Sequence, residues 1–265
     1  MSEDWRAINR AHWNERVAIN LRSRLYDVDG FKAGRRPLRP EQVRDLAPVN
    51  GKTLIHLQCH FGLDTLNWAR LGAEVTGLDF SAPALAAARR LAAELDIAAT
   101  FVEADVYDAP LALKTTYDIV YTGVGALMWL PDIARWAAVV AALLKPGGEL
   151  YLVEFHPTEW MFEDDPLAIR VGYFTPAEGF AYVDTGSYAD REATTSANQT
   201  RQWNHPLGEV VTALIRAGLT LRELRESDES YLQRWPMLER TESGLWRMPR
   251  HLPSLPLMYT LRAVK

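Results

Sequence analysis

The sequence predicts an α/β fold in which a doubly wound, mostly parallel seven-stranded sheet carries helices on both faces. Short apolar segments rich in Val, Ile, Leu and Tyr alternate with helical patterns along most of the chain. Strands that are separated by helices form parallel sheets with right-handed crossovers. The chain has 265 residues, of which 48% are hydrophobic. This composition is sufficient for one large core, or for one core with a small lid.

Seven segments are candidate strands, because each is short, mostly apolar and bounded by turn residues. They are residues 53–58, 74–79, 100–104, 117–122, 149–155, 219–226 and 257–264. Three of the intervening helices have recognisable starts. Ser81 and Asp132 are N-cap residues, and Pro206 opens the third helix.

Residues 53–79 carry the most information about function. They read as an apolar strand, a tight loop closed by Gly62, a helix that stops at Gly72, and a second strand that ends on Asp79. A helix N-terminus after such a loop presents free N–H groups to an anionic part of a ligand. An Asp at the tip of the next strand can accept two hydrogen bonds from a ribose diol. The segment therefore predicts the two halves of a nucleoside-cofactor site.

Composition and charge narrow the class of protein further. The net charge is −5 and no long Lys/Arg run exists, so we expect no nucleic-acid partner. No apolar run reaches about 18 residues, and the charged first residues contain no apolar signal segment, so we expect neither a membrane partner nor export. The single cysteine, Cys59, excludes an internal disulfide and favours a cytoplasmic location. Whether the chain forms a homo-oligomer is left open.

Two segments lie outside the alternation of strands and helices. Residues 1–48 form an N-terminal arm with a helical pattern at its start, and residues 157–204 are polar, aromatic and rich in turn residues. The second segment is too long for a passive connector. We interpret it as a lid, built from a short hairpin or loop layer, that is inserted after the fifth strand and faces the ligand-binding carboxyl edge of the sheet. The predicted core comprises residues 49–156 and 205–265.

Five motifs in order now carry a resemblance. HLQCHFG, VTGLDFS, VEADVYD, YDIVYTGVGALMWLPD and LKPGGELYLVEFHP resemble the motif series of class I S-adenosylmethionine-dependent methyltransferases of the small-molecule type. The resemblance covers residues 53–156 and resumes over 206–265. It implies a Rossmann-like sheet whose last strand is antiparallel, and S-adenosylmethionine as the cofactor. It also implies methyl transfer to an O, N or S atom of a small-molecule acceptor.

The first loop departs from the pattern of that family, which usually reads acid-x-Gly-x-Gly-x-Gly. Here His56 stands at the acid, Gln58 and His60 stand at the first two glycines, and only Gly62 remains. Side chains at 58 and 60 restrict how closely a cofactor approaches the backbone. Either they contact the methionine end of the cofactor, the Gln58 amide included, or they turn away from it. No third ligand accompanies His56 and His60, so we expect no metal site.

The resemblance also assigns individual residues to the cofactor. Asp79 would bind both ribose hydroxyls, although a strand-end Asp can also be a solvated residue or a helix cap. Asp105 would bind the adenine amino group, although it can also be a turn residue. The cofactor-binding residues that the resemblance implies are Gln58, His60, Gly62, Asp79, Phe80, Ala104, Asp105, Val106, Thr122 and Gly123.

Methyl transfer from a sulfonium depends mainly on the alignment of the acceptor, because the leaving group is already activated. We therefore expect a closed aromatic site, with Trp13, Tyr26, Trp129 and Trp203 as substrate-binding residues. His205, His156 and Tyr26 are the candidate catalytic acid/base groups. His205 precedes a helix start, where the dipole favours a neutral imidazole, but it can also be only a cap.

Two other functions stay open at this point. An NAD-type oxidoreductase needs the glycines that Gln58 and His60 replace, and it leaves the KPGG motif unexplained. A non-catalytic regulatory protein would bind the cofactor without turnover.

Overall fold

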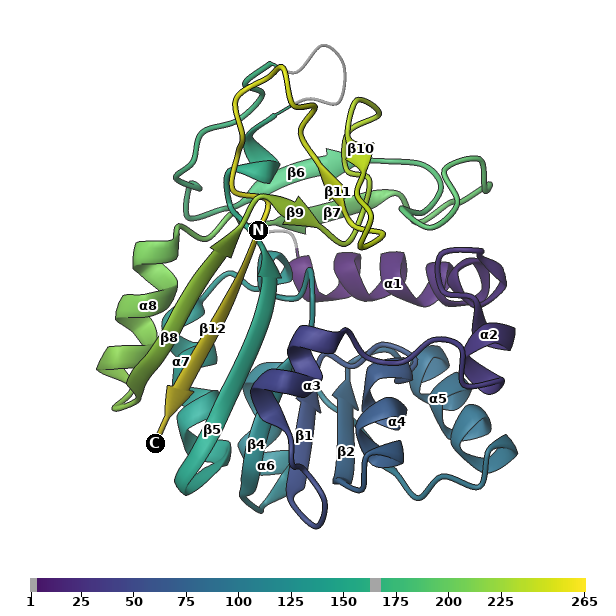
Figure 1. Ribbon diagram of the computed structural model, residues 1–265, viewed down its shortest axis with the longest axis vertical. Coiled ribbons are helices and arrows are strands. Elements are labelled where there is room, and N and C mark those ends of the chain that lie inside the picture. The colour runs from purple at the N-terminus through teal and green to yellow at the C-terminus, as the bar shows by residue number, and fades with distance from the viewer. Residues whose placement is uncertain (1–3, 163–167) are drawn as a thin grey trace.

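Strand β1 (Thr53–Leu57) lies near the middle of a seven-stranded sheet with the order β3-β2-β1-β4-β5-β12-β8 (Figure 1). The computed structural model describes residues 4–162 and 168–265. The other strands of this sheet are β2 (Glu74–Asp79), β3 (Thr100–Glu103), β4 (Tyr117–Thr122), β5 (Leu144–Phe155), β8 (Thr220–Ser227) and β12 (Met258–Val264). Within this sheet, β12 runs antiparallel to its neighbours, β5 and β8. The predicted fold class, with its antiparallel last strand, is confirmed.

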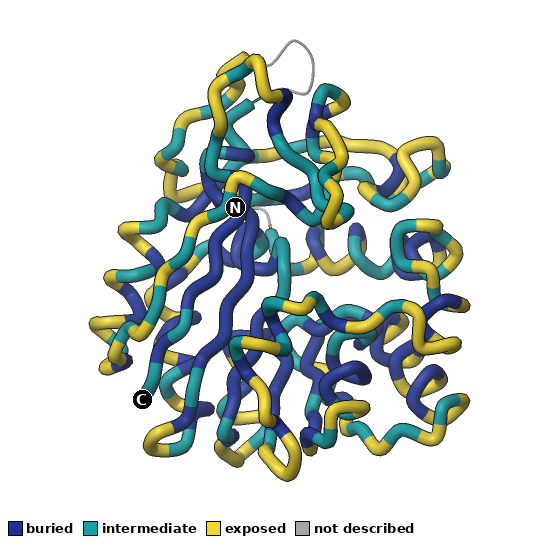
Figure 2. Tube along the Cα trace, viewed as in Figure 1, coloured by how far each residue is buried: buried dark blue, intermediate teal, exposed yellow. Residues whose placement is uncertain are grey.

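Helices cover both faces of the sheet. On one face lie α3 (Pro40–Leu46), α4 (Leu63–Arg70) and α5 (Ala82–Glu94), and on the other lie α6 (Ala109–Leu113), α7 (Ile133–Leu143) and α8 (Leu207–Arg216). Successive side chains of a strand point to opposite faces. Accordingly, Ile55 packs in the core with Trp136 of α7, whereas Leu54 packs with Trp68 of α4. The central strands are the most deeply buried part of the chain (Figure 2).

The predicted helix starts are present. The hydroxyl of Ser81 accepts a hydrogen bond from the backbone N–H of Ala84 at 3.3 Å, at the start of α5. The carboxylate of Asp132 accepts one from Arg135 at 2.8 Å, at the start of α7. Pro206 directly precedes α8. Such caps satisfy N–H groups that have no partner inside the helix.

A second layer lies above the carboxyl edge of the sheet. Helix α1 (Trp5–Arg22) crosses that edge, and α2 (Val28–Lys32) follows it (Figure 1). The predicted hairpin is present after β5 as the antiparallel pair β6 (Phe180–Val183) and β7 (Gln199–Gln202). Asn9 of α1 bonds the backbone of Arg201 twice, at 2.9 Å each. The arm and the insertion are therefore joined, while their division into separate domains stays a prediction.

One part of residues 205–265 differs from the predicted core. Between β8 and β12 the chain forms a small sheet of β9 (Glu229–Ser230), β10 (Glu239–Arg240) and β11 (Trp246–Arg247). It has its own apolar cluster around Trp235 and Leu257. Strands of two residues are too short to show a hydrophobic period, so no sequence pattern indicated this sheet.

Among the described residues, no helix is both long enough and apolar enough to cross a lipid bilayer.

Candidate active site

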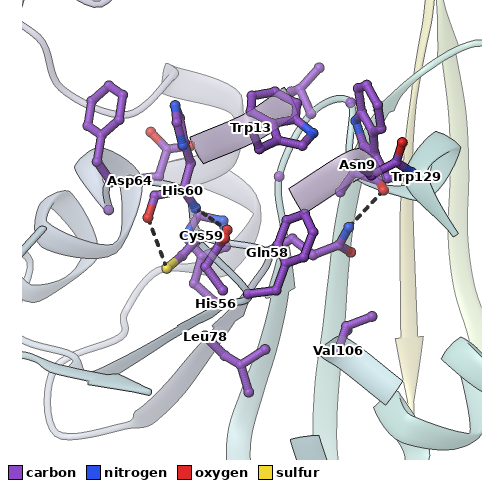
Figure 3. Close-up of a pocket in the computed structure, with 18 of the residues that line it drawn as sticks. Asn9, Trp13, His56, Gln58, Cys59, His60, Asp64, Leu78, Val106 and Trp129 are labelled. Carbon is purple, nitrogen blue, oxygen red and sulfur yellow. Dashed lines mark hydrogen bonds between the residues drawn. The ribbon is translucent and has the colours of Figure 1, made fainter. Parts of the chain in front are cut away.

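A cavity of about 200 Å³ lies at the carboxyl edge of the sheet, under α1 (Figure 3). Its walls come from the segments after β1, β2, β3 and β4, which the sheet order brings together around β1. This is the edge at which open α/β sheets bind ligands. The predicted cofactor residues that line it are Gln58, His60, Gly62, Asp79, Phe80, Ala104, Asp105, Val106 and Gly123. Thr122, the remaining one, is completely buried and is not part of the lining.

The first loop keeps the backbone course of a glycine-rich turn although two of its residues carry side chains. Gln58 and His60 have φ angles of 54° and 51°, in the left-handed region that favours glycine, and Gly62 has 76°. Each such non-glycine residue costs about 1–3 kcal/mol. Both side chains line the cavity, so this loop brings polar groups to a place where glycines would leave space.

Gln58 has one satisfied and one unsatisfied polar atom. Its Nε2 donates to the carbonyl oxygen of Ala126 at 2.9 Å (Figure 3). Its Oε1 is buried and has no hydrogen-bond partner among the described residues. A buried acceptor without a donor costs about 1–3 kcal/mol. A ligand that supplies an N–H or O–H at this point recovers that free energy.

His56 and His60 are neutral imidazoles with separate partners. His56 Nδ1 lies 2.8 Å from the hydroxyl of Thr65, and His60 Nε2 lies 3.2 Å from Asn20 Nδ2 of α1. Asn20 in turn accepts a hydrogen bond from Ser187 of the insertion at 2.6 Å. Burial lowers the pKa of each histidine to about 3. No group of three or more metal-ligating side chains occurs in the described part of the chain.

Asp79 faces the cavity from the tip of β2. Its two carboxylate oxygens accept hydrogen bonds from the backbone N–H groups of His60 at 2.8 Å and Ser81 at 2.9 Å. Burial raises its pKa to about 6, against the opposing effect of these N–H groups. Asp79 therefore anchors the first loop and still presents free lone pairs to the cavity, because each carboxylate oxygen accepts more than one hydrogen bond.

Asp105 marks the end of the cavity beside β3. One oxygen accepts from the backbone N–H of Tyr107 at 2.9 Å and so starts the short turn η1 (Val106–Asp108). The other oxygen is 2.9 Å from Nε of Arg6 in α1. This ion pair ties the N-terminal helix to the segment after β3.

Aromatic rings form the opposite wall. Trp13 of α1 packs edge-on against Trp129 at 5.1 Å between ring centroids, against His60 at 5.3 Å and against Tyr188 at 6.1 Å. Trp129 belongs to the turn η2 (Leu127–Trp129) after β4. Tyr26 completes the wall, and its hydroxyl is hydrogen-bonded to that of Tyr188. Burial raises the pKa of Tyr26 to about 12, so its hydroxyl stays protonated and is a poor general base.

The structure does not bring His205 or His156 to this cavity, and so it does not support them as the acid/base groups. His205 Nε2 is 2.7 Å from the carbonyl oxygen of Leu130, and its Nδ1 is 3.2 Å from Glu209. His156 Nδ1 accepts from the backbone N–H of Thr158 at 3.2 Å, and its Nε2 lies 2.8 Å from a carboxylate oxygen of Glu226. Burial lowers the pKa of His156. All four ring nitrogens face protein atoms.

Trp203 is also outside the cavity lining. Its side chain is buried, its Nε1 donates to the carbonyl oxygen of Ala177 at 3.2 Å, and its ring packs edge-on against Trp5 at 5.7 Å. Trp5 does line the cavity. Trp203 therefore supports the wall from behind and does not form its surface.

Glu154 of β5 positions the loop after β4. Its Oε2 accepts hydrogen bonds from the backbone N–H groups of Gly125 at 2.5 Å and Ala126 at 3.2 Å. Burial raises its pKa to about 8. Ala126 is also the acceptor for Gln58, so Glu154 connects β5 to the first loop through one peptide segment.

Two polar lining residues, Asn9 and Asp64, were missed from the sequence. Asn9 is one of the polar residues on α1, and only the packing of that helix shows that it faces the cavity. Asp64 stands in the first turn of α4. An acid there is expected for the helix dipole alone, so its sequence position did not distinguish a ligand contact.

The doubly wound sheet and the cavity at its carboxyl edge define an α/β protein that binds a nucleoside-type ligand. A sequence profile described as "Methyltransferase domain" matches residues 55–150. A methyltransferase of Synechocystis, named as uncharacterized, is 32% identical over 157 residues, which are 58% of this chain and 71% of that protein. The chain belongs to the S-adenosylmethionine-dependent methyltransferase family.

Other relatives match less of their own length. A ubiquinone biosynthesis O-methyltransferase of Proteus mirabilis is 33% identical over 136 residues, which cover 50% of this chain and 55% of that protein. The chain thus spans about half the length of this relative.

Solved structures share the fold. An S-adenosylmethionine-dependent methyltransferase from Mesorhizobium loti superposes with a TM-score of 0.57 at 22% identity, over 85% of this chain and 96% of that one. Magnesium protoporphyrin IX methyltransferase from Synechocystis, with bound S-adenosylhomocysteine, superposes with a TM-score of 0.57 at 16% identity, over 99% of this chain and 100% of that one.

Proposed function

We propose that this protein transfers the methyl group of S-adenosylmethionine to an O, N or S atom of a small molecule in the cavity. The observation that supports this proposal most directly is the order of three polar elements along one cavity wall. Asp105 after β3, Asp79 after β2 and the first loop after β1 follow one another along the sheet edge. These groups fit the base, the ribose and the amino-acid end of the cofactor in turn.

Two residues of the cavity also fit the amino-acid end of the cofactor. The unpartnered Oε1 of Gln58 is an acceptor for an ammonium group. A Cβ placed on Gly123 would lie 3.3 Å from His56 Nε2, so the glycine keeps the space above the end of β4 open. When bound, the cofactor supplies a methyl group on a sulfonium leaving group.

The chain's own contribution is alignment and exclusion of water. Trp13, Trp129 and Tyr26 close the cavity over the sheet edge, and aromatic faces also stabilise a sulfonium by about 0.5–2 kcal/mol. Alignment of an acceptor supplies on the order of 7–11 kcal/mol. The two histidines of the wall are neutral with a pKa of about 3, and Tyr26 stays protonated. We infer that none of these three groups removes a proton from the acceptor, whose reacting atom is a neutral or already deprotonated nucleophile.

We further infer a small-molecule acceptor and no nucleic-acid partner. The net charge of −5 and the absence of a long basic run in the sequence support this view. The single cysteine favours the cytoplasm.

Calorimetric titration with S-adenosylhomocysteine tests the cofactor assignment. We expect the wild-type protein to bind it and Asp79→Ala to weaken binding roughly 10–150-fold, because a hydrogen bond to a charged acceptor contributes about 1.5–3 kcal/mol. Asp29→Ala, at an exposed position in α2, is the matched control. Unchanged affinity in Asp79→Ala would contradict the assignment.

Turnover is tested separately. The wild-type protein is incubated with S-adenosylmethionine and a panel of small phenols, amines and thiols, and release of S-adenosylhomocysteine is measured. Acceptor-dependent release supports an enzyme. Tight cofactor binding without release for any acceptor class would favour the regulatory alternative.

A further inference from the structure

We propose that Asp64 is the counterion of a protonated amine that binds in the cavity. The residues that line the cavity include three carboxyl side chains, Asp64, Asp79 and Asp105, and no lysine or arginine. The proposal rests on the proposed function, because the amine belongs either to the methyl donor or to its acceptor.

Asp64 is the least compensated of the three carboxylates. Asp79 receives two backbone N–H groups, and Asp105 receives one together with the guanidinium of Arg6. Asp64 receives the hydroxyl of Tyr121 on Oδ2 at 2.9 Å. Within the described part of the chain its other oxygen has no hydrogen-bond donor.

The position of Asp64 is fixed although its charge is not neutralised. Tyr121, its donor, accepts a hydrogen bond from Gln42 Nε2 at 2.7 Å, so the phenol hydrogen is directed toward the carboxylate. Asp64 also lies in the first turn of α4, where the helix N-terminus favours an anion. The carboxylate is therefore held in place before any ligand arrives.

The two guanidinium groups whose charges act on Asp64 have other partners. Arg36 donates to the carbonyl oxygen of Leu25, and the guanidinium of Arg39 lies 4.7 Å from the ring centre of Tyr231. Neither forms an ion pair with Asp64 among the described residues. The pKa of Asp64 is raised by burial. The hydrogen bond from Tyr121 and the charges of the two arginines lower that pKa, but their effect is smaller than that of burial. Asp64 is half-buried, and a carboxylate that is partly withdrawn from water is stabilised by a cation partner.

The surroundings favour an ammonium over other ligand groups. Tyr26, which feels the charge of Asp64, packs against His60 at 5.8 Å and Phe61 at 4.6 Å, and aromatic faces attract cations. The unpartnered Oε1 of Gln58 adds a second acceptor on the same cavity. An ammonium has three donors and no acceptor, so it matches a cavity with surplus acceptors. A carboxylate or phosphate group brings further acceptors and therefore does not match this cavity.

Two sources could supply this ammonium, and paired ligands distinguish them. S-adenosylhomocysteine carries the α-ammonium of the donor, whereas 5′-methylthioadenosine keeps the nucleoside and the thioether without the amino acid. If the donor supplies the amine, Asp64→Asn weakens S-adenosylhomocysteine binding about 10–150-fold. It leaves 5′-methylthioadenosine within about threefold of wild type. Asp29→Asn is the control for removal of one exposed acid.

The acceptor is the source if Asp64→Asn binds S-adenosylhomocysteine normally. Small primary and secondary amines are then added to the cofactor-loaded protein, and thermal unfolding is followed. Amines should raise the unfolding temperature of the wild type and not of Asp64→Asn. If the variant binds the nucleosides and the amines as the wild type does, the proposal is overturned.

A measurement on the wild-type protein covers the case in which Asp64→Asn does not fold. N-acetylation of S-adenosylhomocysteine removes the positive charge, so the acetylated ligand should bind at least about tenfold more weakly if the donor's amine pairs with Asp64. If it binds equally and no amine stabilises the wild type, the proposal fails. Failure of the proposed function looks different, because neither nucleoside would then bind the wild-type protein.

Discussion

The carboxyl edge of the sheet has two regions with similar side chains and opposite character. Above β1 to β4 a cavity of about 200 Å³ is lined by His56, His60 and Asp79, among others. Above β5 and β12, beside Glu154 and His205, only about 10 Å³ remains. Both regions place histidines and acids at strand ends, yet only the first leaves room for a ligand among the described residues.

The difference comes from what packs above each region. Over the closed region the insertion contributes Trp160, Trp203 and Asn204, and Asn204 Nδ2 donates to the carbonyl oxygen of Pro157 at 2.9 Å. Glu154 and His205 there are likewise hydrogen-bonded to the protein's own backbone, at Gly125 and Leu130 respectively. Over the open region α1 spans the edge without filling it. A titratable residue at a sheet edge is thus a site residue only where the covering layer leaves space.

A substitution that fills the open region should reduce cofactor affinity and turnover more than any other change predicted below. Gly123→Val places methyl groups against His56 Nε2, because even a Cβ at position 123 would lie only 3.3 Å from that atom. The same methyl groups take up space that we assign to the cofactor, so affinity for S-adenosylmethionine should fall by more than about tenfold, which corresponds to about 1.4 kcal/mol, with a matching loss of turnover. Calorimetry and product release measure this.

Gly208→Val is the matched control for that variant, because a Cβ at Gly208 in α8 meets no atom within 4 Å. It should bind the cofactor like the wild type. If Gly123→Val also binds normally, the cofactor does not pass over the end of β4, and the open region is assigned wrongly.

A change of pH should have an intermediate effect on ligand binding in the open region. Burial raises the pKa of Asp79 to about 6, and the ionised form is the stronger acceptor for ribose hydroxyls. As the pH falls through 6 the carboxylate is protonated, so affinity for S-adenosylhomocysteine should drop about tenfold between pH 7.5 and pH 5. Asp79→Asn should bind weakly with a flat profile. A wild-type profile that is equally flat would show that Asp79 does not titrate in this range, or does not bind the ligand.

The open region was largely predictable from the sequence, and the reason is local. Asp79, Asp105 and Gly123 follow strands, and in a parallel sheet consecutive strand ends meet at one edge. Gln58 and His60 were placed by their spacing from Gly62, although their left-handed backbone was not foreseen. The strand that carries each of these residues to the sheet edge lies within a few positions of it along the chain, whereas their side-chain contacts, such as that of Gln58 with Ala126, were not predictable.

The closed region was not predictable, because contacts between distant segments decide it. His205 reads as a histidine at a helix start near the ligand edge. Its Nε2 is instead bonded to Leu130, 75 positions away, and this contact depends on how residues 157–204 pack. The small sheet of β9, β10 and β11 was missed for a related reason, since its stability comes from Trp235 and Leu257 meeting across a long loop.

The smallest effect on turnover and cofactor affinity is expected for a substitution of His205, which lies in the closed region. Neither ring nitrogen is directed to the open cavity, because Nε2 faces the carbonyl oxygen of Leu130 and Nδ1 faces Glu209. His205→Asn keeps an N–H donor near Leu130 and removes the imidazole. Turnover and cofactor affinity should stay within about threefold of the wild type. The free energy of unfolding should fall by about 0.5–1.5 kcal/mol for the weakened hydrogen bond. Product release and denaturant unfolding measure the two quantities.

A general base would give the reverse pattern, in which turnover falls about 10²-fold or more while stability is unchanged. That outcome would mean that the closed region opens during the reaction and that both halves of the sheet edge serve the acceptor.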